Sequence, residues 1–397
     1  MPNLRRLSIL LPAAVLLAAS AGFLHASGPS PEPPTLAEPA ALAVPAALAV
    51  PAVVPGLSFM RTFDGVRFHQ PEPREMTFGQ MLKKTFGSRR GPWRKFIATL
   101  PGEAPPERVC DGDLRVTMVN HATLLVQMDG VNLLTDPTWA ARSVPTVGVK
   151  RHRPPGLRFE DLPPIDAVVI SHNHQDHMDL PTLRRLSAER HPVVYAGLGN
   201  AVFLAREKVA KAKDLDWWQS VELAPGVTIT AVPARHHSGR FLFDKNKTLW
   251  AGFVLSGPSG SVYFAGDTGW GDHFAAIGQR FPDLRLAILP IGGFKPVWYM
   301  REVHIGPEDA LEAMRLLGAE AMIPMHFGTF PNGDEGDSEA ALTLQALVDD
   351  SDDATLKDRV VILDNGQTWM SEPKRHESAP DLPLQAIFEQ AIPIAAP

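Results

Sequence analysis

A series of short apolar segments between Arg115 and Asn365 constrains the fold of this chain more than any other feature. Apolar runs of this length, bounded by turn residues, are typical of β-strands. Asp129-Gly130, between two of the runs, is a strong hairpin signal. We expect strands at 115–119, 123–128, 131–137, 166–170, 227–234, 250–255, 261–267, 285–291, 321–327 and 359–365.

Helical segments separate some of these strands. The segment 307–317 has the clearest signals, because Pro307 stands in its first turn, Glu308 and Asp309 lie near the positive end of the helix dipole, and Gly318 ends it. Strands that arrive as hairpins, with helices inserted later, favour an α/β fold: a single-domain, four-layer αββα sandwich with two sheets face to face and helices outside. Further helices are expected at 181–190, 201–213, 274–281 and 338–348.

The N-terminal residues predict export followed by a tether. Arg5 and Arg6 precede an apolar run, and small residues at 19–21 fit a cleavage site, so the start is a cleaved signal or a membrane anchor. We therefore expect an exported protein, located in the periplasm or at the inner membrane of a bacterium. Repeated Pro and Ala then oppose both helix and strand. The expected boundaries are 1–27 for the signal or anchor, 28–56 for the tether and 57–397 for the folded domain, with its core at 114–370.

Composition excludes several classes of function. The formal net charge is −6 and the pI is near 6.2, so the chain has no global basic bias toward nucleic acid. A single cysteine, Cys110, excludes an intrachain disulfide framework and a cysteine-based zinc site. Any metal must therefore be held by nitrogen and oxygen ligands, for which 14 histidines are available.

The stretch 171–179, "SHNHQDHMD", concentrates potential ligands directly after an apolar strand. His172 and His174 are two residues apart and can point the same way, whereas Asp176 and His177 turn toward a neighbouring position. Buried imidazoles and acids this close would repel one another or stay unpaired without a compensating cation. Such ligands suit Zn²⁺, with Fe and Mn as alternatives. The spacing predicts ligands for two adjacent metals.

Three remote residues can complete such a site. A two-metal site needs a shared carboxylate and one further histidine for each metal. Asp267, His236 and His326 each follow or end a predicted strand, and side chains at strand ends converge on one sheet edge. Asp136, at another strand end, and His121 are expected to orient the ligands through hydrogen bonds, with turn or packing roles as the alternative.

These residues resemble a known family. H-x-H-x-D-H at 172–177, followed by the later His, Asp and His, is similar to the metallo-β-lactamase fold superfamily. The narrower motifs "LPIGGFKPVWYM", "VHIGPEDA" and "MHFGTF" resemble its N-acyl-phosphatidylethanolamine-hydrolysing phospholipase D branch and the bacterial relatives of that branch. The resemblance spans Leu114 to Phe330. It implies that one zinc is held by His172, His174 and His236, the other by Asp176, His177 and His326, and that Asp267 bridges them.

One departure from the family concerns His237, which stands where members usually have an aromatic residue. This leaves His236 and His237 as alternative ligands. The place of His236 two residues after Pro233-Ala234 favours His236.

The expected activity is that of a zinc-dependent phosphodiesterase of phospholipase D type. Metal-bound hydroxide would attack the phosphorus of an N-acyl-phosphatidylethanolamine-like lipid, and Asp267 or Asp176 would relay a proton to the leaving alkoxide. His304 would contact the substrate phosphate or a ligand, with packing at a helix start as the alternative. An apolar channel for acyl chains, or alternatively a buried core patch, is expected from Phe294, Trp298, Tyr299 and Met300.

Two other functions compete with this one. A lactonase or another ester or amide hydrolase is the alternative on the same fold, because one scaffold supports many chemistries. A di-iron redox protein ranks lower, since no flavin domain or glycine-rich dinucleotide loop accompanies the site. The expected partners are a phospholipid or another small-molecule substrate and a membrane surface, but no nucleic acid. The sequence does not indicate an oligomeric state.

Overall fold

The structure, a computed structural model, describes residues 62–70, 90–144, 148–241, 243–371 and 373. Every described residue lies within 47–397, the second of the two units into which the chain divides. The predicted signal or anchor and the predicted tether lie outside the described residues. No helix in the described part of the chain has the length and apolar character needed to cross a membrane.

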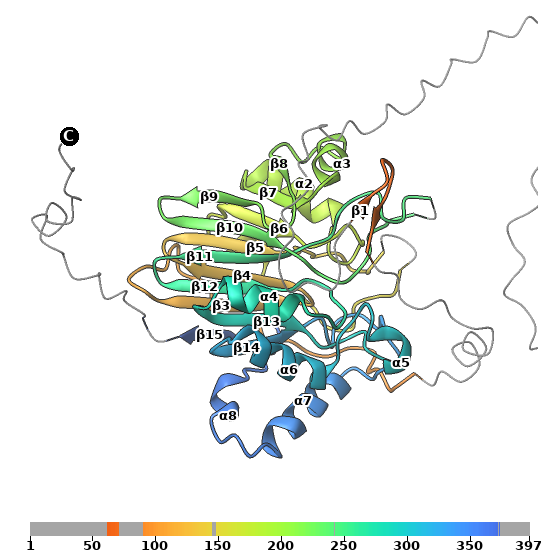
Figure 1. Cartoon of the computed structure of the whole chain (residues 1–397), viewed down its shortest axis with the longest axis vertical. Helices are drawn as coiled ribbons and strands as arrows, with labels where there is room; N and C mark the ends of the chain where they lie inside the picture. The colour runs from red at the N-terminus through yellow and green to blue at the C-terminus, as the bar shows by residue number, and fades with distance from the viewer. Residues whose placement is uncertain (1–61, 71–89, 145–147, 242, 372, 374–397) are drawn as a thin grey trace, which may run out of the picture. The chain divides into compact units, whose positions relative to one another are not determined.

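Two large β-sheets form the centre of the second unit (Figure 1). The first has the strand order β15-β3-β4-β5-β6-β7-β8, and the second has the order β14-β13-β12-β11-β10-β9. A separate hairpin pairs β1 with β2. Bounds in the first sheet are β3 Leu114–Asn120, β4 Thr123–Met128, β5 Val131–Thr135, β6 Ala167–Ile170, β7 Val193–Gly197, β8 Ala212–Leu215 and β15 Thr368–Ser371. Those of the other strands are β1 Thr62–Phe63, β2 Phe68–His69, β9 Ser220–Ala224, β10 Val227–Val232, β11 Gly252–Gly257, β12 Gly260–Phe264, β13 Leu284–Pro290 and β14 Ala321–Met325.

Strand direction decides which strand ends share an edge. In the first sheet β3, β4 and β5 are antiparallel neighbours, and β5 to β8 are parallel. In the second sheet β9 to β12 are antiparallel neighbours, and β12, β13 and β14 are parallel. The carboxyl ends of β5 and β6 therefore lie at one edge of the first sheet, and those of β10, β12 and β14 lie at one edge of the second.

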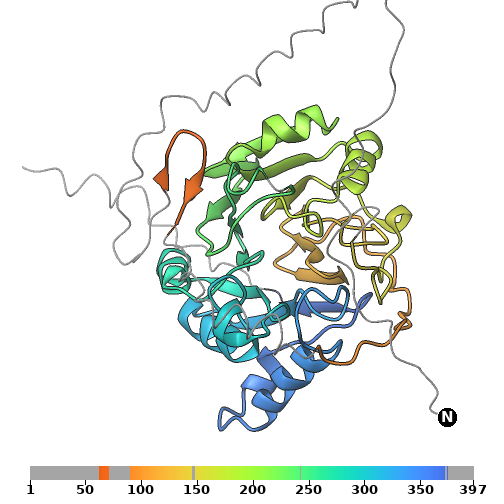
Figure 2. The ribbon, with the colours of Figure 1, turned by 90° about the vertical axis from the view of Figure 1, so that its right-hand side faces the viewer.

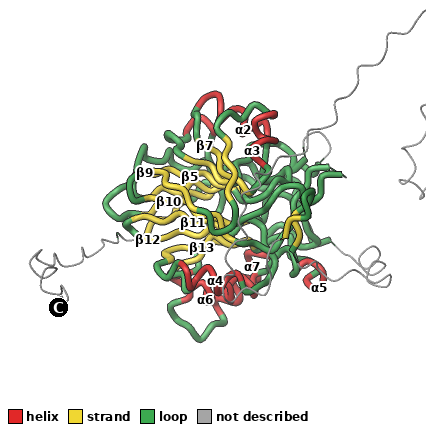
Figure 3. Tube along the Cα trace, turned by 45° about the horizontal axis from the view of Figure 1, so that its top comes forward, coloured by secondary structure: helices red, strands yellow, loops and turns green. Residues whose placement is uncertain are grey.

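Three apolar clusters define the four layers, which confirms the predicted sandwich. The central cluster joins the facing sides of the sheets. It contains Leu124 and Val126 from the first sheet together with Phe253 and Phe264 from the second. A second cluster covers the outer side of the first sheet with α2 and α3, and a third covers the second sheet with α4, α6 and α7. Figure 3 shows these two helical groups on opposite sides of the strands, and Figure 2 gives the perpendicular view. The helices are η1 Phe159–Asp161, α2 Leu180–Glu189, α3 Asn200–Arg206, α4 His273–Arg280, α5 Val297–Met300, α6 Pro307–Leu317, α7 Glu339–Asp349 and α8 Leu356–Arg359.

Local signals in the sequence are confirmed at the turns. Asp129 and Gly130 have φ values of 50° and 75° and join β4 to β5, whose end residues Met128 and Val131 pair. The helix α6 has the predicted bounds, and Gly318 ends it with a φ of 65°.

Two element predictions are wrong. The segment 359–365 forms no named strand, because Arg359 ends α8 and the segment then touches β14 through a single bridge between Val360 and Met322. Val360 and Leu363 are buried, and Val361 and Ile362 half-buried, by packing instead of by strand pairing. The predicted helix 201–213 ends at Arg206, because Ala212–Leu215 pairs with β7 as β8. Tertiary pairing here overrides the helical preference of the segment.

Candidate metal centre

The histidines and acids of the predicted site lie at the carboxyl ends of strands from both sheets. The stretch 171–179 follows β6, His236 follows β10, Asp267 follows β12 and His326 follows β14. His121 stands in the turn between β3 and β4 with a φ of 45°. These elements bring residues that are far apart in sequence to one place.

A first cluster consists of His172, His174 and His236. Nε2 of His172 lies 2.7 Å from Nδ1 of His174, and Nε2 of His236 lies 3.4 Å from the same atom. The three ligand atoms are thus close enough to share one ion. His237 lies beside the cluster, with its ring edge-to-face against that of His174 at 4.8 Å between ring centres. Of the two alternatives, the geometry therefore favours His236.

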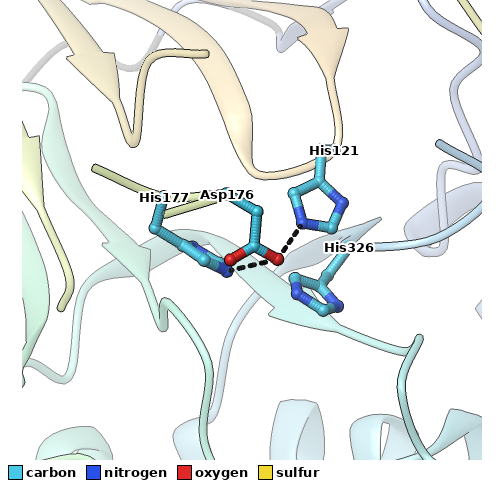
Figure 4. A group of neighbouring side chains, drawn as sticks. All are labelled: His121, Asp176, His177 and His326. Carbon is cyan, nitrogen blue, oxygen red and sulfur yellow. Dashed lines mark hydrogen bonds and ion pairs between the residues drawn. The ribbon is translucent and has the colours of Figure 1, made fainter. Parts of the chain in front are cut away.

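A second cluster consists of His121, Asp176, His177 and His326 (Figure 4). Oδ2 of Asp176 lies 3.3 Å from Nε2 of His121 and 3.9 Å from Nε2 of His177. The ring of His326 lies beside that of His121, with 4.1 Å between ring centres and the ring planes tilted by 38°. His121 thus lies among the potential ligands themselves, closer to the centre than an orienting residue needs to be.

Asp267 joins the two clusters. Its Oδ2 lies 3.2 Å from Nε2 of His177 and from Nε2 of His326, both in the second cluster. The same oxygen lies 3.9 Å from Nε2 of His172 and of His236 in the first. One buried carboxylate therefore reaches both clusters, which is the arrangement that a bridging ligand requires.

Asp136 fixes the orientation of ligands in both clusters. Its Oδ2 accepts hydrogen bonds from Nδ1 of His177 at 2.7 Å and from the hydroxyl of Ser171 at 2.5 Å. Because the Ser171 hydroxyl donates to Asp136, it accepts from Nδ1 of His172 at 2.9 Å. Both imidazoles thereby turn Nε2 toward the centre, as carboxylate–histidine pairs do around metals.

A backbone carbonyl orients the third histidine of the first cluster. Nδ1 of His236 donates to the carbonyl oxygen of Val303 at 2.9 Å, which leaves Nε2 as the unprotonated nitrogen. Burial, together with neighbouring histidines, lowers the pKa of His172 and of His236 well below the usual range, and that of His174 to about 3. All three imidazoles are therefore neutral at pH 7, the form that binds metals.

The second cluster carries charge. Burial opposes protonation of His177 and His326, but the neighbouring carboxylates, Asp267 first, raise the pKa of both. Burial likewise opposes ionisation of Asp176 and Asp267, but the histidines, His177 first, hold the pKa of both carboxyls well below the usual range. Ionised carboxylates here require positive charge beside them, which is what a metal dication supplies.

The donor set fits a metal pair. Several buried polar atoms of the site make no hydrogen bond to any described residue: Nδ1 of His121, Nε2 of His177, both ring nitrogens of His326, Nδ1 of His304 and Oδ1 of Asp267. Nitrogen and oxygen atoms that lack a hydrogen-bond donor can instead bind a metal cation through their lone pairs. The only cysteine, Cys110, is exposed and belongs to none of these groups, so the donors are nitrogen and oxygen alone.

His304 borders the centre, since its Nδ1 lies 3.8 Å from Oδ2 of Asp267. Of the four residues predicted to form either an apolar channel or a core patch, Phe294 is buried in the apolar cluster that includes residues of α4, α6 and α7, which favours the core patch at this position. Trp298 is exposed on α5, where Tyr299 and Met300 are half-buried.

Three residues that support the metal centre were not predicted from the sequence. Ser171 stands inside the histidine-rich stretch, so its place between a strand end and a ligand was a usable signal. Asn332 donates from Nδ2 to Oδ2 of Asp176 at 2.7 Å, and no motif marks it. Glu335 is buried and accepts the backbone N–H groups of Gly293 at 2.6 Å and Lys295 at 3.3 Å. Such contacts depend on loop geometry, which spacing does not reveal.

Comparison with known proteins agrees with this geometry. Residues 131–327 match a family described as the beta-lactamase superfamily domain. The chain is 36% identical over 274 residues to N-acyl-phosphatidylethanolamine-hydrolyzing phospholipase D 1 of Caenorhabditis elegans, covering 65% of this chain and 76% of that protein. It is 30% identical to a metal-dependent hydrolase of Methanopyrus kandleri, covering 64% of this chain and 99% of the relative.

A solved structure shares the architecture. A metallo hydrolase from the archaeon Ignicoccus hospitalis superposes with a TM-score of 0.50 at 26% identity, covering 66% of this chain and all of that one. Together with the two sequence relatives and the donor set above, this structural similarity shows that the chain is a metal-dependent hydrolase. The chain belongs to the metallo-β-lactamase fold superfamily, in the branch that contains the N-acyl-phosphatidylethanolamine-hydrolysing phospholipases D.

Proposed function

We propose that the chain is a two-zinc phosphodiesterase of phospholipase D type that hydrolyses N-acyl-phosphatidylethanolamine-like lipids. The observation that carries the proposal is the position of Asp267, whose one oxygen reaches histidines of both clusters. The 36% sequence identity to the Caenorhabditis elegans phospholipase, over 76% of that protein, supports the proposed substrate class.

The donor sets suit zinc in both clusters. The first cluster offers three imidazoles, and the second adds a carboxylate to imidazoles. When bound, the two cations would lower the pKa of a shared water and supply hydroxide near neutral pH. The histidines of the first cluster need not lose a proton to bind metal at pH 7, because their low pKa values keep them neutral.

The protein's own residues then handle the proton. Asp267 is ionised at neutral pH, since neighbouring histidines lower its pKa despite burial. Its unprotonated carboxylate would take the proton that remains on the attacking hydroxide and pass it to the leaving alkoxide as the P–O bond breaks. Asp176 is the alternative relay. His304 is neutral at pH 7, because burial lowers its pKa to about 4, so it contacts a substrate phosphate only through a neutral N–H.

Exposed apolar residues beside the centre support a lipid substrate and a membrane surface as partner. Phe241 and Phe243 are 71% and 82% exposed. Their loop lies against the histidine-rich stretch, because the Arg240 guanidinium donates to the carbonyl oxygens of Asn173 and Met178. Trp298 is exposed on α5, which leads into the loop that carries His304. Exposed aromatic side chains of this kind favour binding at a lipid interface.

Lipid hydrolysis by the mature, zinc-loaded protein tests the proposal. N-acyl-phosphatidylethanolamine vesicles should yield N-acylethanolamine and phosphatidic acid, measured by mass spectrometry, with a lactone and a carboxylic ester as parallel substrates. Cleavage of the lactone or ester without cleavage of the phospholipid would replace the phosphodiesterase with the alternative hydrolase. Two irons in place of zinc in the protein as purified, measured before zinc is added, would favour redox chemistry.

We also propose that the chain is exported and that residues 28–56 tether the folded domain. The support is the basic start, the apolar run and the small residues at 19–21. Sequencing the N-terminus of protein recovered from cell fractions tests this, because an intact Met1 in soluble cytoplasm would contradict export.

A further inference from the structure

The two carboxylates of the metal centre are held in different ways. Asp267 is 4% exposed and surrounded by histidines. The side chain of Asp176 is 16% exposed, so one side of it faces solvent. A carboxylate at such an opening can rotate and bind water unless a fixed donor holds it. The support of Asp176 therefore decides how well the second cluster is formed.

Asp176 receives hydrogen bonds from two directions. On the buried side, Nε2 of His121 lies 3.3 Å from Oδ2. On the open side, Nδ2 of Asn332 donates to the same oxygen at 2.7 Å, the shorter of the two contacts. Asn332 is itself exposed, so the shorter contact comes from the rim of the site.

The segment that carries Asn332 is anchored on both sides. Before it, His326 donates its backbone N–H to the carbonyl oxygen of His121 at 2.9 Å, which ties the end of β14 to the turn after β3. After it, the buried Glu335 accepts the backbone N–H of Gly293 at 2.6 Å, and Asp337 accepts two hydrogen bonds from the Arg94 guanidinium at 2.9 and 3.0 Å. The asparagine amide is thus presented to Asp176 by a braced loop.

We propose that Asn332 is a positioning residue that fixes the rotation of the Asp176 carboxylate and thereby sets the metal affinity of the second cluster. In the part of the chain that the structure describes, Asn332 hydrogen-bonds to Asp176 and to the backbone carbonyl of Phe330, and neither residue belongs to the first cluster. Loss of the amide should therefore weaken one metal and spare the other. The inference rests on the proposed two-metal site but not on the proposed lipid substrate.

Zinc titration of the full-length protein tests the inference. Metal-free wild type and variants are titrated with Zn²⁺ against a chromophoric chelator, which resolves two dissociation constants. Residues that orient ligands typically contribute 10- to 100-fold to metal affinity. Asn332→Ala should weaken the binding of one zinc about 10-fold and change the other less than about 2-fold. Co²⁺ absorption spectra of the same variants identify which cluster has changed.

Two further variants separate hydrogen bonding from other causes. Asn332→Leu keeps the size of the side chain but cannot donate, so it should lose as much zinc affinity as Asn332→Ala. Gln175→Ala is the matched control, because it removes an amide that donates to the Arg240 carbonyl oxygen from a position next to Asp176. It should leave both zinc affinities within about 2-fold of wild type.

The outcomes are distinguishable. Wild-type affinity in Asn332→Ala, or recovery in Asn332→Leu, would overturn the positioning role while leaving the two-metal site intact. A wild type that binds fewer than two zincs would overturn both the site and this inference. Far-UV circular dichroism confirms that each variant is folded, which the exposure of Asn332 favours.

Discussion

The two clusters of the metal centre use different physics to hold similar ligands. In the first cluster every imidazole is neutral, and fixed hydrogen bonds to Ser171 and to the Val303 carbonyl orient His172 and His236. In the second cluster the neighbouring carboxylates raise the pKa of His177 and His326 against the effect of burial, and Asp176 is open to solvent on one side. The metal centre thus combines an uncharged first cluster with a charged second cluster, whose geometry depends on contacts at the solvent-exposed edge of the site.

This difference indicates where each half is vulnerable. The first cluster should respond to changes in the residues that set its tautomers, such as Ser171. The second should respond to loss of charge or of a rim contact, such as that of Asn332. Asp136 and Asp267 serve both clusters, so changes there should not separate them.

The largest effect is expected from Asp267→Asn. The substitution removes the shared negative charge while preserving the shape of the side chain, so both clusters lose their common ligand. We expect turnover of N-acyl-phosphatidylethanolamine to fall by about 1000-fold, which corresponds to roughly 4 kcal/mol of transition-state stabilisation. The assay is product release, with circular dichroism as the control for folding. Retained activity would contradict a bridged site.

The next largest effects are expected from Asp136→Asn and Ser171→Ala, which test whether the two clusters can be weakened together or separately. Asp136→Asn weakens the support of His177 and, through Ser171, of His172, so both zinc affinities should fall by about 10- to 100-fold. Ser171→Ala leaves the bond between Asp136 and His177, so only the first cluster should weaken, by about 10-fold. Zinc titration measures both. An equal loss in both clusters for Ser171→Ala would show that they do not respond separately.

The aromatic loop beside the first cluster should affect lipid binding and not metal binding. Replacing both Phe241 and Phe243 by Ser removes exposed apolar area, and burying one such side chain contributes about 1.5–3 kcal/mol. We expect vesicle binding, measured by co-sedimentation, to fall by about 10-fold or more, while zinc content and hydrolysis of a detergent-dispersed substrate stay near wild type. Unchanged sedimentation would exclude this loop from the membrane contact.

The smallest effect is expected from Glu335→Gln, which weakens the anchor of the loop near the second cluster. The two backbone N–H groups of Gly293 and Lys295 donate to different oxygens of Glu335, and the amide of Gln can accept only one of these hydrogen bonds because its NH2 group is a donor. We expect a loss of about 1 kcal/mol in the free energy of unfolding, measured by urea denaturation. Zinc binding by the first cluster serves as the internal control and should not change.

Much of this architecture follows from local sequence signals. Alternating apolar runs and helices predicted the sandwich, and the Asp129-Gly130 turn and α6 have the expected form. The convergence of strand ends follows from the parallel pairing of β12 to β14, which brings Asp267 and His326 together. Ligand types and their approximate neighbours are therefore accessible from a single sequence.

Other features depend on tertiary contacts. The strand β8 forms because β7 offers a free edge to Ala212–Leu215, although the segment favours a helix. Phe294 is buried because α4, α6 and α7 cover it, which no local pattern distinguishes from a channel. Asn332 reaches Asp176 through an irregular loop, so only the folded structure reveals the contact.

Zinc stoichiometry and lipid hydrolysis, measured on one sample of the mature protein and of Asp267→Asn, test the central claim most directly. The account predicts that wild type contains about two zincs per chain and releases N-acylethanolamine. It further predicts that Asp267→Asn is folded, holds less zinc and releases no measurable product. A wild type with one zinc, or full hydrolysis by Asp267→Asn, would contradict a centre in which one carboxylate joins two metals.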